Sequence, residues 1–137
     1  MNLLKSVAVV CGLALGSLVL NTGEAQAAKN KYAMVAFKNN EDFTIKYYFR
    51  WGKDSEWKLY SVKPGDYHWH SWEYEFINEN RSPTPQIKFD SDLSEDTDWV
   101  TYTLKAYAAP AQDVDYAKIY KFVTKSRGVL DLVSIGD

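Results

Sequence analysis

Cysteine is almost absent from this chain, and its scarcity excludes several classes of protein. The only cysteine, Cys11, lies in an apolar run from Val7 to Leu20. Lys5 precedes this run and the small-x-small triplet Ala25-Gln26-Ala27 follows it, which is the layout of a secretory signal peptide. We therefore expect residues 1–27 to be removed. The remaining chain would be secreted or periplasmic, with no disulfide, no cysteine nucleophile and no cysteine metal ligand.

The sequence also lacks an apolar run long enough to span a membrane. A helix that crosses a bilayer needs roughly 20 apolar residues, and the run from Val7 to Leu20 is shorter and contains Gly12 and Gly16. An uncleaved anchor is the alternative to a signal peptide. We expect no stable membrane anchor once the segment is cleaved.

A basic excess is missing as well. The formal net charge is −2, which argues against nucleic acid as a partner. Residues 28–137 have the length of one modest domain, and without disulfides this domain depends on its core for stability. The 5 Trp, 10 Tyr and 6 Phe residues all lie in this part. Because each buried aromatic side chain removes roughly 150–250 Å² from water, such a core is credible.

The clearest local order is an alternating stretch between Asp42 and Gly52. Successive side chains of a strand point to opposite faces, so one apolar face and one polar face are predicted. The predicted core face consists of Phe43, Ile45, Tyr47, Phe49 and Trp51. The predicted outer face consists of Thr44, Lys46, Tyr48 and Arg50.

Helical periodicity is absent from residues 28–137, and short strands separated by turn residues account for the pattern. The predicted fold is all-β, an antiparallel β-sandwich of about seven or eight short strands, with a small β-barrel as the alternative. The other strands are expected at 32–38, 57–63, 66–77, 86–90, 99–108, 116–124 and 129–135. We expect the first two strands to form a hairpin and residues 78–85 to cross between sheets.

Several short motifs resemble a small exported β-domain that recurs in uncharacterised bacterial proteins. These motifs are Arg50-Trp51-Gly52, Trp57, Pro64-Gly65, Ser82-Pro83, Phe89-Asp90 and Asp92-Leu93-Ser94. The resemblance covers most of the mature chain and implies a secreted module with a β-sandwich-like fold. It implies no known reaction and no catalytic residues.

Exposed aromatic side chains are the main candidates for ligand binding. Flat rings on a sheet surface can stack on the apolar faces of sugars, although they can equally fill a core. Tyr48 and Arg50 lie on the predicted outer face of their strand, and Tyr67 and Trp69 lie in an aromatic strand with rings on both faces. These four residues are the predicted ligand-binding residues.

Two clusters could hold a metal ion. His68 and His70 are two residues apart and share a strand face, but aromatic-like packing explains them equally well. Asp90, Asp92 and Asp96 belong to an acidic loop whose oxygens are of the type that calcium prefers. A solvated turn is the alternative reading of that loop. We therefore expect no cofactor, apart from a structural calcium at these three aspartates.

Catalytic motifs are lacking. The chain has no Gly-x-Ser-x-Gly elbow, and the carboxylate pair Glu73 and Glu75 has a spacing common on wet strand faces. The predicted function is a non-catalytic binding or structural module with an unknown protein or glycan partner. A carbohydrate-binding module is the first alternative, and a small hydrolase is the second.

Overall fold

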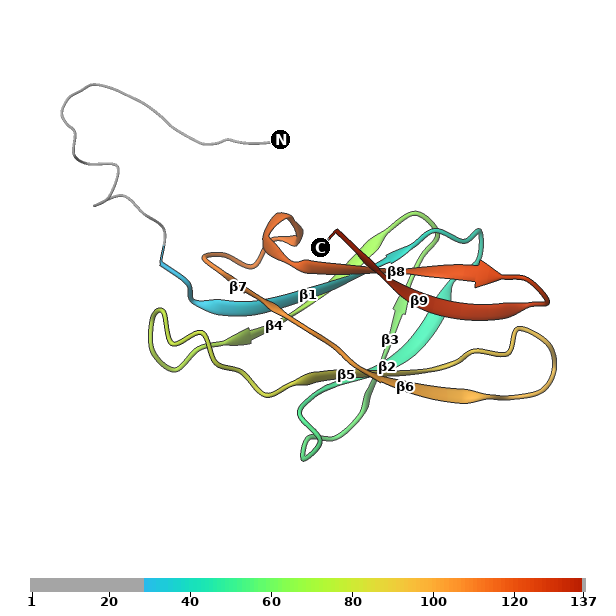
Figure 1. The fold of residues 1–137 in the computed structure, drawn as a ribbon, viewed down its shortest axis with the longest axis horizontal. Coiled ribbons are helices and arrows are strands. Elements are labelled where there is room, and N and C mark those ends of the chain that lie inside the picture. Colours follow the sequence, from blue (N-terminus) through green and yellow to red (C-terminus); the bar gives the residue numbers. More distant parts are fainter. Residues whose placement is uncertain (1–28, 137) are drawn as a thin grey trace, which may run out of the picture.

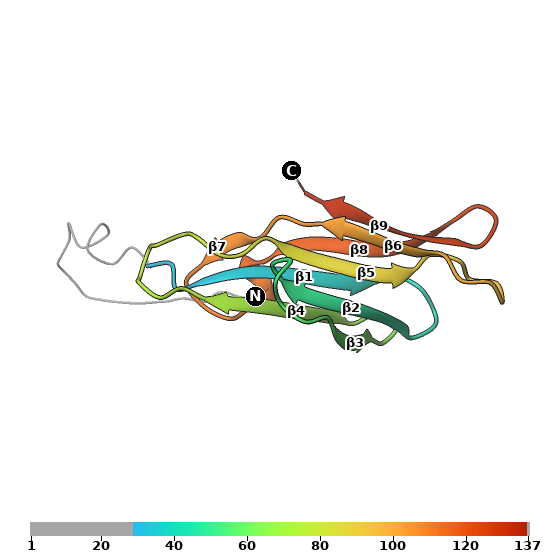
Figure 2. The same ribbon diagram turned by 90° about the horizontal axis from the view of Figure 1, so that it is seen from below.

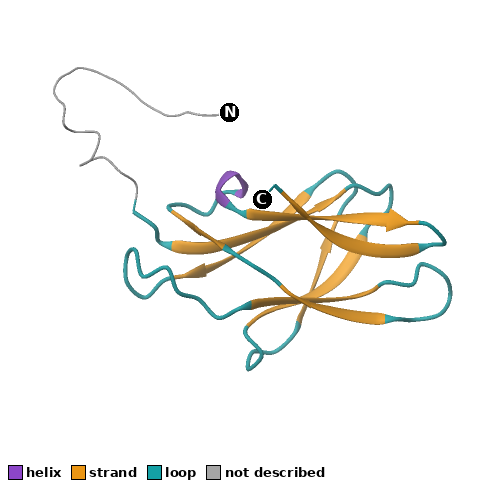
Figure 3. Cartoon of the chain, viewed as in Figure 1, coloured by secondary structure: helices purple, strands orange, loops and turns teal. Residues whose placement is uncertain are grey.

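The computed structural model describes residues 29–136, which form a two-layered β-sandwich (Figures 1 and 3). Its nine strands are β1 (Tyr32–Asn39), β2 (Ile45–Trp51), β3 (Lys58–Val62), β4 (Tyr67–Glu73), β5 (Pro85–Asp90), β6 (Trp99–Thr103), β7 (Tyr107–Ala109), β8 (Lys118–Lys125) and β9 (Val129–Ile135). A 3₁₀ turn, η1 (Val114–Tyr116), precedes β8. No helix in this range is long and apolar enough to cross a membrane. The predicted signal peptide and Cys11 lie outside the described residues.

The strands divide into two open sheets, which lie one above the other in Figure 1 and are seen face-on in Figure 2. The first sheet has the order β4-β1-β8-β9, and β7 pairs with the first residues of β1. The second sheet has the order β3-β2-β5-β6. The prediction of a β-sandwich is therefore confirmed. The sheets are not purely antiparallel, because β8 runs parallel to β1.

The core lies between the two sheets and is built from alternate residues of each strand. Ile45, Tyr47 and Phe49 of β2 are buried and Trp51 is half-buried, so the predicted core face of this strand is confirmed. Opposite them, Val35 and Phe37 of β1 are fully buried. The remaining buried members of this core are Val62, Ile87, Phe89, Leu104, Phe122, Leu130 and Leu132.

Two predicted connections are wrong. The first two strands do not form a hairpin, because β1 and β2 belong to different sheets. The buried Asn39 amide donates hydrogen bonds to the carbonyl oxygens of Phe43 and Val62, and these bonds fix the crossing. The single strand predicted at 99–108 is wrong too, because this stretch contains two strands. It leaves the second sheet after Thr103, buries Leu104 and joins the first sheet as β7.

The crossover predicted at residues 78–85 is confirmed, since β4 lies in the first sheet and β5 in the second. The strand before it is shorter than predicted. It ends at Glu73, where the chain turns and the Tyr74 amide donates to the Lys31 carbonyl.

Only part of the outer face of the first sheet is covered. Met34 and Ala36 pack there against Ala109 and Ala117, which flank the segment containing η1. Beyond this cover, the outward side chains of β4 remain open to solvent.

Candidate ligand-binding cleft

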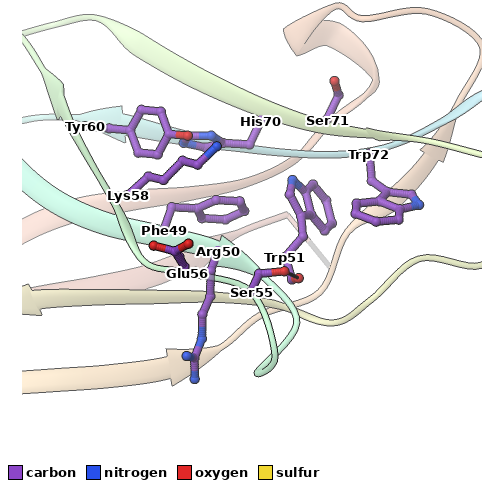
Figure 4. Close-up of a pocket in the computed structure, with 10 residues that line it drawn as sticks. All are labelled: Phe49, Arg50, Trp51, Ser55, Glu56, Lys58, Tyr60, His70, Ser71 and Trp72. Atoms are coloured by element: carbon purple, nitrogen blue, oxygen red, sulfur yellow. Dashed lines mark hydrogen bonds between the residues drawn. The ribbon is translucent and has the colours of Figure 1, made fainter.

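A cleft of about 300 Å³ opens where the edge strand of one sheet faces the edge strand of the other. We call it the edge cleft. Phe49 and Trp51 of β2, Tyr60 of β3, and His70 and Trp72 of β4 supply its aromatic lining (Figure 4). Strand alternation places them there: β2 and β3 project alternate residues toward the first sheet, and β4 projects His70 and Trp72 toward the second.

Two tryptophan side chains lie close together in the cleft. The ring centres of Trp51 and Trp72 are 6.2 Å apart with the planes tilted by 54°, and Figure 4 shows them converging from β2 and β4. Trp72 is 37% exposed, so part of its ring is available to a ligand. The sequence pattern assigned Trp51 to the core; its half-buried ring in fact serves both the core and the cleft.

The deepest polar group of the cleft is the imidazole of His70, which is 7% exposed. Its Nε2 and the Tyr47 hydroxyl are joined by a hydrogen bond of 2.7 Å, and its ring stacks on Phe49 with centres 4.0 Å apart. Burial, with a smaller contribution from the neighbouring His68, lowers the pKa of His70 to about 3. Burial and the nearby Tyr60 raise the pKa of Tyr47 far above its ordinary value. Both groups are therefore uncharged at neutral pH.

His68 and His70 share the inner face of β4, and their rings stack with centres 4.8 Å apart. His68 donates from Nδ1 to the Ser61 carbonyl oxygen at 3.0 Å, because a carbonyl can only accept. Within residues 29–136, no three histidine or acidic side chains are grouped as a metal site requires. The two imidazoles pack with Tyr47 and Tyr60 in an aromatic cluster.

The rim of the edge cleft is polar. Glu56 and Lys58 are exposed there. Ser55 and Ser71 also line the cleft, and their hydroxyls already have partners. Ser55 Oγ donates to the Trp51 carbonyl at 2.6 Å, and Ser71 Oγ accepts from Gln112 at 2.8 Å. The cleft thus combines an aromatic floor with carboxylate, ammonium and hydroxyl groups at its mouth.

A second hollow of about 290 Å³ shares Trp72 with the edge cleft. The carboxylate pair considered from the sequence, Glu73 and Glu75, lines this hollow together with Glu79 and Arg81. The Glu79 carboxylate accepts a hydrogen bond from the Glu75 backbone amide. The acids therefore lie beside the cleft and not inside it.

Tyr48 and Arg50, two of the predicted binding residues, lie on the outer side of the second sheet. Arg50 is among the residues that line the edge cleft, but its guanidinium points away from the cleft in Figure 4. The outer side also carries Trp57, Lys88 and Trp99, which were not among the four predicted binding residues. We call these five residues the aromatic–cation face. Their grouping depends on the β2–β5–β6 register, which a single strand pattern does not contain.

Tyr67 and Trp69, the other predicted binding residues, lie on the outer side of the first sheet. They are exposed, and the Lys38 ammonium lies 4.6 Å from the centre of the Tyr67 ring. The structure therefore separates the four predicted residues into two pairs on opposite sides of the sandwich, and no single site contains all four.

The acidic loop uses its predicted calcium ligands to bond its own backbone. Asp90 Oδ1 accepts from the amides of Asp92 and Asp98, and Asp92 Oδ1 accepts from the amide and hydroxyl of Ser94. The hydrogen bonds from the Ser94 hydroxyl and amide lower the pKa of Asp92. Asp96 is exposed. Calcium binding at Asp90, Asp92 and Asp96 stays a prediction.

Comparisons with protein-family models, with curated proteins and with solved structures found no match to this chain. The resemblance to an exported β-domain therefore stays a prediction. Function must be inferred from the side chains that the fold brings together.

Proposed function

We propose that this protein is an exported, non-catalytic binding module that holds a glycan in the edge cleft. The observation that carries the proposal is the pairing of Trp51 and Trp72 in the lining of a cleft of about 300 Å³ with a polar rim. Cavities of roughly 300–1,000 Å³ with aromatic walls and a few polar groups are typical of small-ligand sites.

A sugar ring matches this lining because it has two kinds of surface. Its C–H groups form apolar patches that can stack on the partly exposed Trp72 indole. Its hydroxyls can donate to Glu56 and accept from Lys58 at the rim. The neighbouring hollow with Glu79 and Arg81 adjoins Trp72 and offers further polar contacts to a longer chain.

The side chains of the cleft support binding over catalysis. Its histidine is bonded to Tyr47, and the low pKa keeps the imidazole neutral across the ordinary pH range. The hydroxyls of Ser55 and Ser71 have partners other than a histidine. An acyl-transfer site would need a nucleophile within hydrogen-bond reach of a base, and no such pair lines the edge cleft.

Glycan arrays and pull-downs with insoluble polysaccharides test the proposal. Once a ligand is found, titration of tryptophan fluorescence gives its affinity. We expect Trp72→Ala to weaken binding at least tenfold, which corresponds to about 1.4 kcal/mol, because the exposed stacking surface is lost.

Trp69→Ala is the matched control. Trp69 is 40% exposed, close to the 37% of Trp72, but lies on the outer side of the first sheet. Its replacement should leave affinity unchanged while both variants keep the circular dichroism spectrum of a folded protein. Failure to retain any glycan, or equal loss in the two variants, would contradict the proposal.

A further inference from the structure

The aromatic–cation face presents two positive charges embedded among aromatic rings. The Arg50 guanidinium carbon lies 4.1 Å from the centre of the Trp57 ring. The Lys88 ammonium lies 4.8 Å from Trp57, 5.2 Å from Tyr48 and 6.0 Å from Trp99. Tyr48 and Trp99 also contact each other edge to face, with centres 5.8 Å apart. Arg50 and Lys88 are both half-buried, so the rings have replaced part of their water.

Neither cation has a carboxylate partner within residues 29–136. Arg50 donates from Nε to the neutral Gln86 amide oxygen at 2.8 Å, which fixes the guanidinium. Its Nη atoms donate no hydrogen bond to any other described residue. In the described part of the chain, Lys88 forms no ion pair. The nearest acid on the outer side of β5, Asp90, bonds the amides of its own loop.

We propose that this face is a second binding surface, separate from the edge cleft, that takes the acidic groups of an anionic polysaccharide. A fixed, partly desolvated cation loses little conformational entropy when an oxyanion binds. Each contact therefore contributes more binding free energy than it would at a mobile surface lysine. The guanidinium presents a planar pair of donors suited to a carboxylate or sulfate.

The other side chains of the face favour a polysaccharide over a polynucleotide or a lipid surface. Trp99 is 54% exposed and Leu59, on the same side of β3, is 56% exposed, which gives sugar C–H groups an apolar contact. Arg50 and Lys88 lie over the faces of the Trp57 and Tyr48 rings, so these faces are not open to the base stacking that a single-stranded polynucleotide needs. Trp99 and Leu59 are the only large apolar side chains more than half exposed on this face among the described residues, which is little for insertion among lipids.

Binding to polygalacturonate, dextran sulfate and neutral dextran tests the proposal by isothermal titration and affinity electrophoresis. The protein should bind one or both of the acidic polymers, with affinity falling as NaCl rises from 50 to 500 mM. Lys88→Gln should weaken that binding about tenfold. Preference for the carboxylated or the sulfated polymer identifies which acidic group is taken.

Lys38→Gln is the matched control, because Lys38 also lies over an aromatic ring but on the outer side of the first sheet. It should leave polysaccharide binding unchanged. Equal losses in Lys38→Gln and Lys88→Gln would show a general charge effect and overturn the proposal. Tighter binding of single-stranded oligo-dT, or of phosphatidylserine vesicles, than of either polymer would overturn it too.

The Trp72→Ala variant separates this surface from the glycan-binding cleft. It should retain the acidic polymers while losing the neutral glycan found for the cleft. If no neutral glycan binds, the function proposed for the cleft fails, whereas the effect of Lys88→Gln on acidic polymers still decides the second surface. If Lys88→Gln binds those polymers as tightly as the wild type, the proposal of a second surface is contradicted, whereas the proposal for the cleft still stands.

Discussion

The buried His70 makes stability depend on pH in a way that can be calculated. Its pKa falls from an ordinary 6.5 to about 3 in the folded protein. The unfolded chain therefore takes up a proton near pH 6.5, while the folded protein does not until about pH 3. Protons stabilise the state that binds them, so the free energy of unfolding decreases as the pH falls from 6.5 toward 3. Above pH 6.5, His70 contributes no pH dependence.

The expected size follows from the separation of the two pKa values. One pKa unit corresponds to about 1.4 kcal/mol, so lowering the pH from 7.5 to 5.0 should remove about 2 kcal/mol of stability through His70. Carboxylates contribute little in this range, because their ordinary pKa values are near 4. Loss of this size is a large fraction of the roughly 5–15 kcal/mol that stabilises a typical domain.

Urea unfolding at several pH values between 7.5 and 5.0 measures this dependence in the wild type and in His70→Gln. The variant should lose about 1–3 kcal/mol at pH 7.5, because the stacking on Phe49 is removed. Its stability should then fall by about 2 kcal/mol less than that of the wild type on acidification. Parallel pH curves, or an imidazole NMR titration of His70 near 6.5, would refute the reasoning.

Two further predictions concern the backbone. Gly52 has φ of 85°, and a Cβ there would lie 2.9 Å from the Cβ of Pro83. Gly65 has φ of 79°, and a Cβ there would meet open space. Gly65→Ala should therefore cost only about 1–2 kcal/mol of backbone strain. Gly52→Ala adds a steric clash to this strain, so thermal melts should show a larger loss of stability for Gly52→Ala. Asn39→Ala should cost about 2–4 kcal/mol in urea unfolding, because two carbonyls lose buried amide donors. A loss within 0.5 kcal/mol of zero would contradict that role.

The faces of individual strands could be predicted because alternation is a local property. The pattern from Phe43 to Trp51 identified the buried residues of β2, and residues 129–135 were predicted with the bounds that β9 has. Each of these predictions needs only the order of apolar and polar side chains along a few residues.

Strand partners could not be predicted in the same way, because pairing depends on residues far apart in the chain. The polar turn after Asn39 fits a hairpin and a crossing between sheets equally well by composition. The structure decides through the Asn39 amide, which bonds the Val62 carbonyl 23 residues away. In the stretch 99–108, the change of sheet occurs at Leu104, which no Gly or Pro marks.

Predicting the candidate surfaces requires both the alternation within each strand and the pairing between strands. Tyr48 and Arg50 lie on the outer side of β2, as alternation predicts, but their partners Lys88 and Trp99 come from β5 and β6. The edge cleft depends on where the two sheets separate beside Trp72, which the sequence does not encode locally. An aromatic strand with rings on both faces was the one signal that pointed toward it.

The adjacent residues Arg50 and Trp51 show why one strand can support two different surfaces. Alternation sends Arg50 to the outer side of the second sheet and Trp51 to the edge cleft, while Phe49 and Tyr47 remain in the core. A shift of the register by one residue would exchange every one of these positions. Burial of Tyr47 and Phe49 therefore fixes the register that sends Arg50 outward and Trp51 to the cleft. Both proposed surfaces depend on this burial of β2. Tyr67 and Trp69 lie on the outer side of β4, whose inner side chains His70 and Trp72 complete the edge cleft from the opposite sheet.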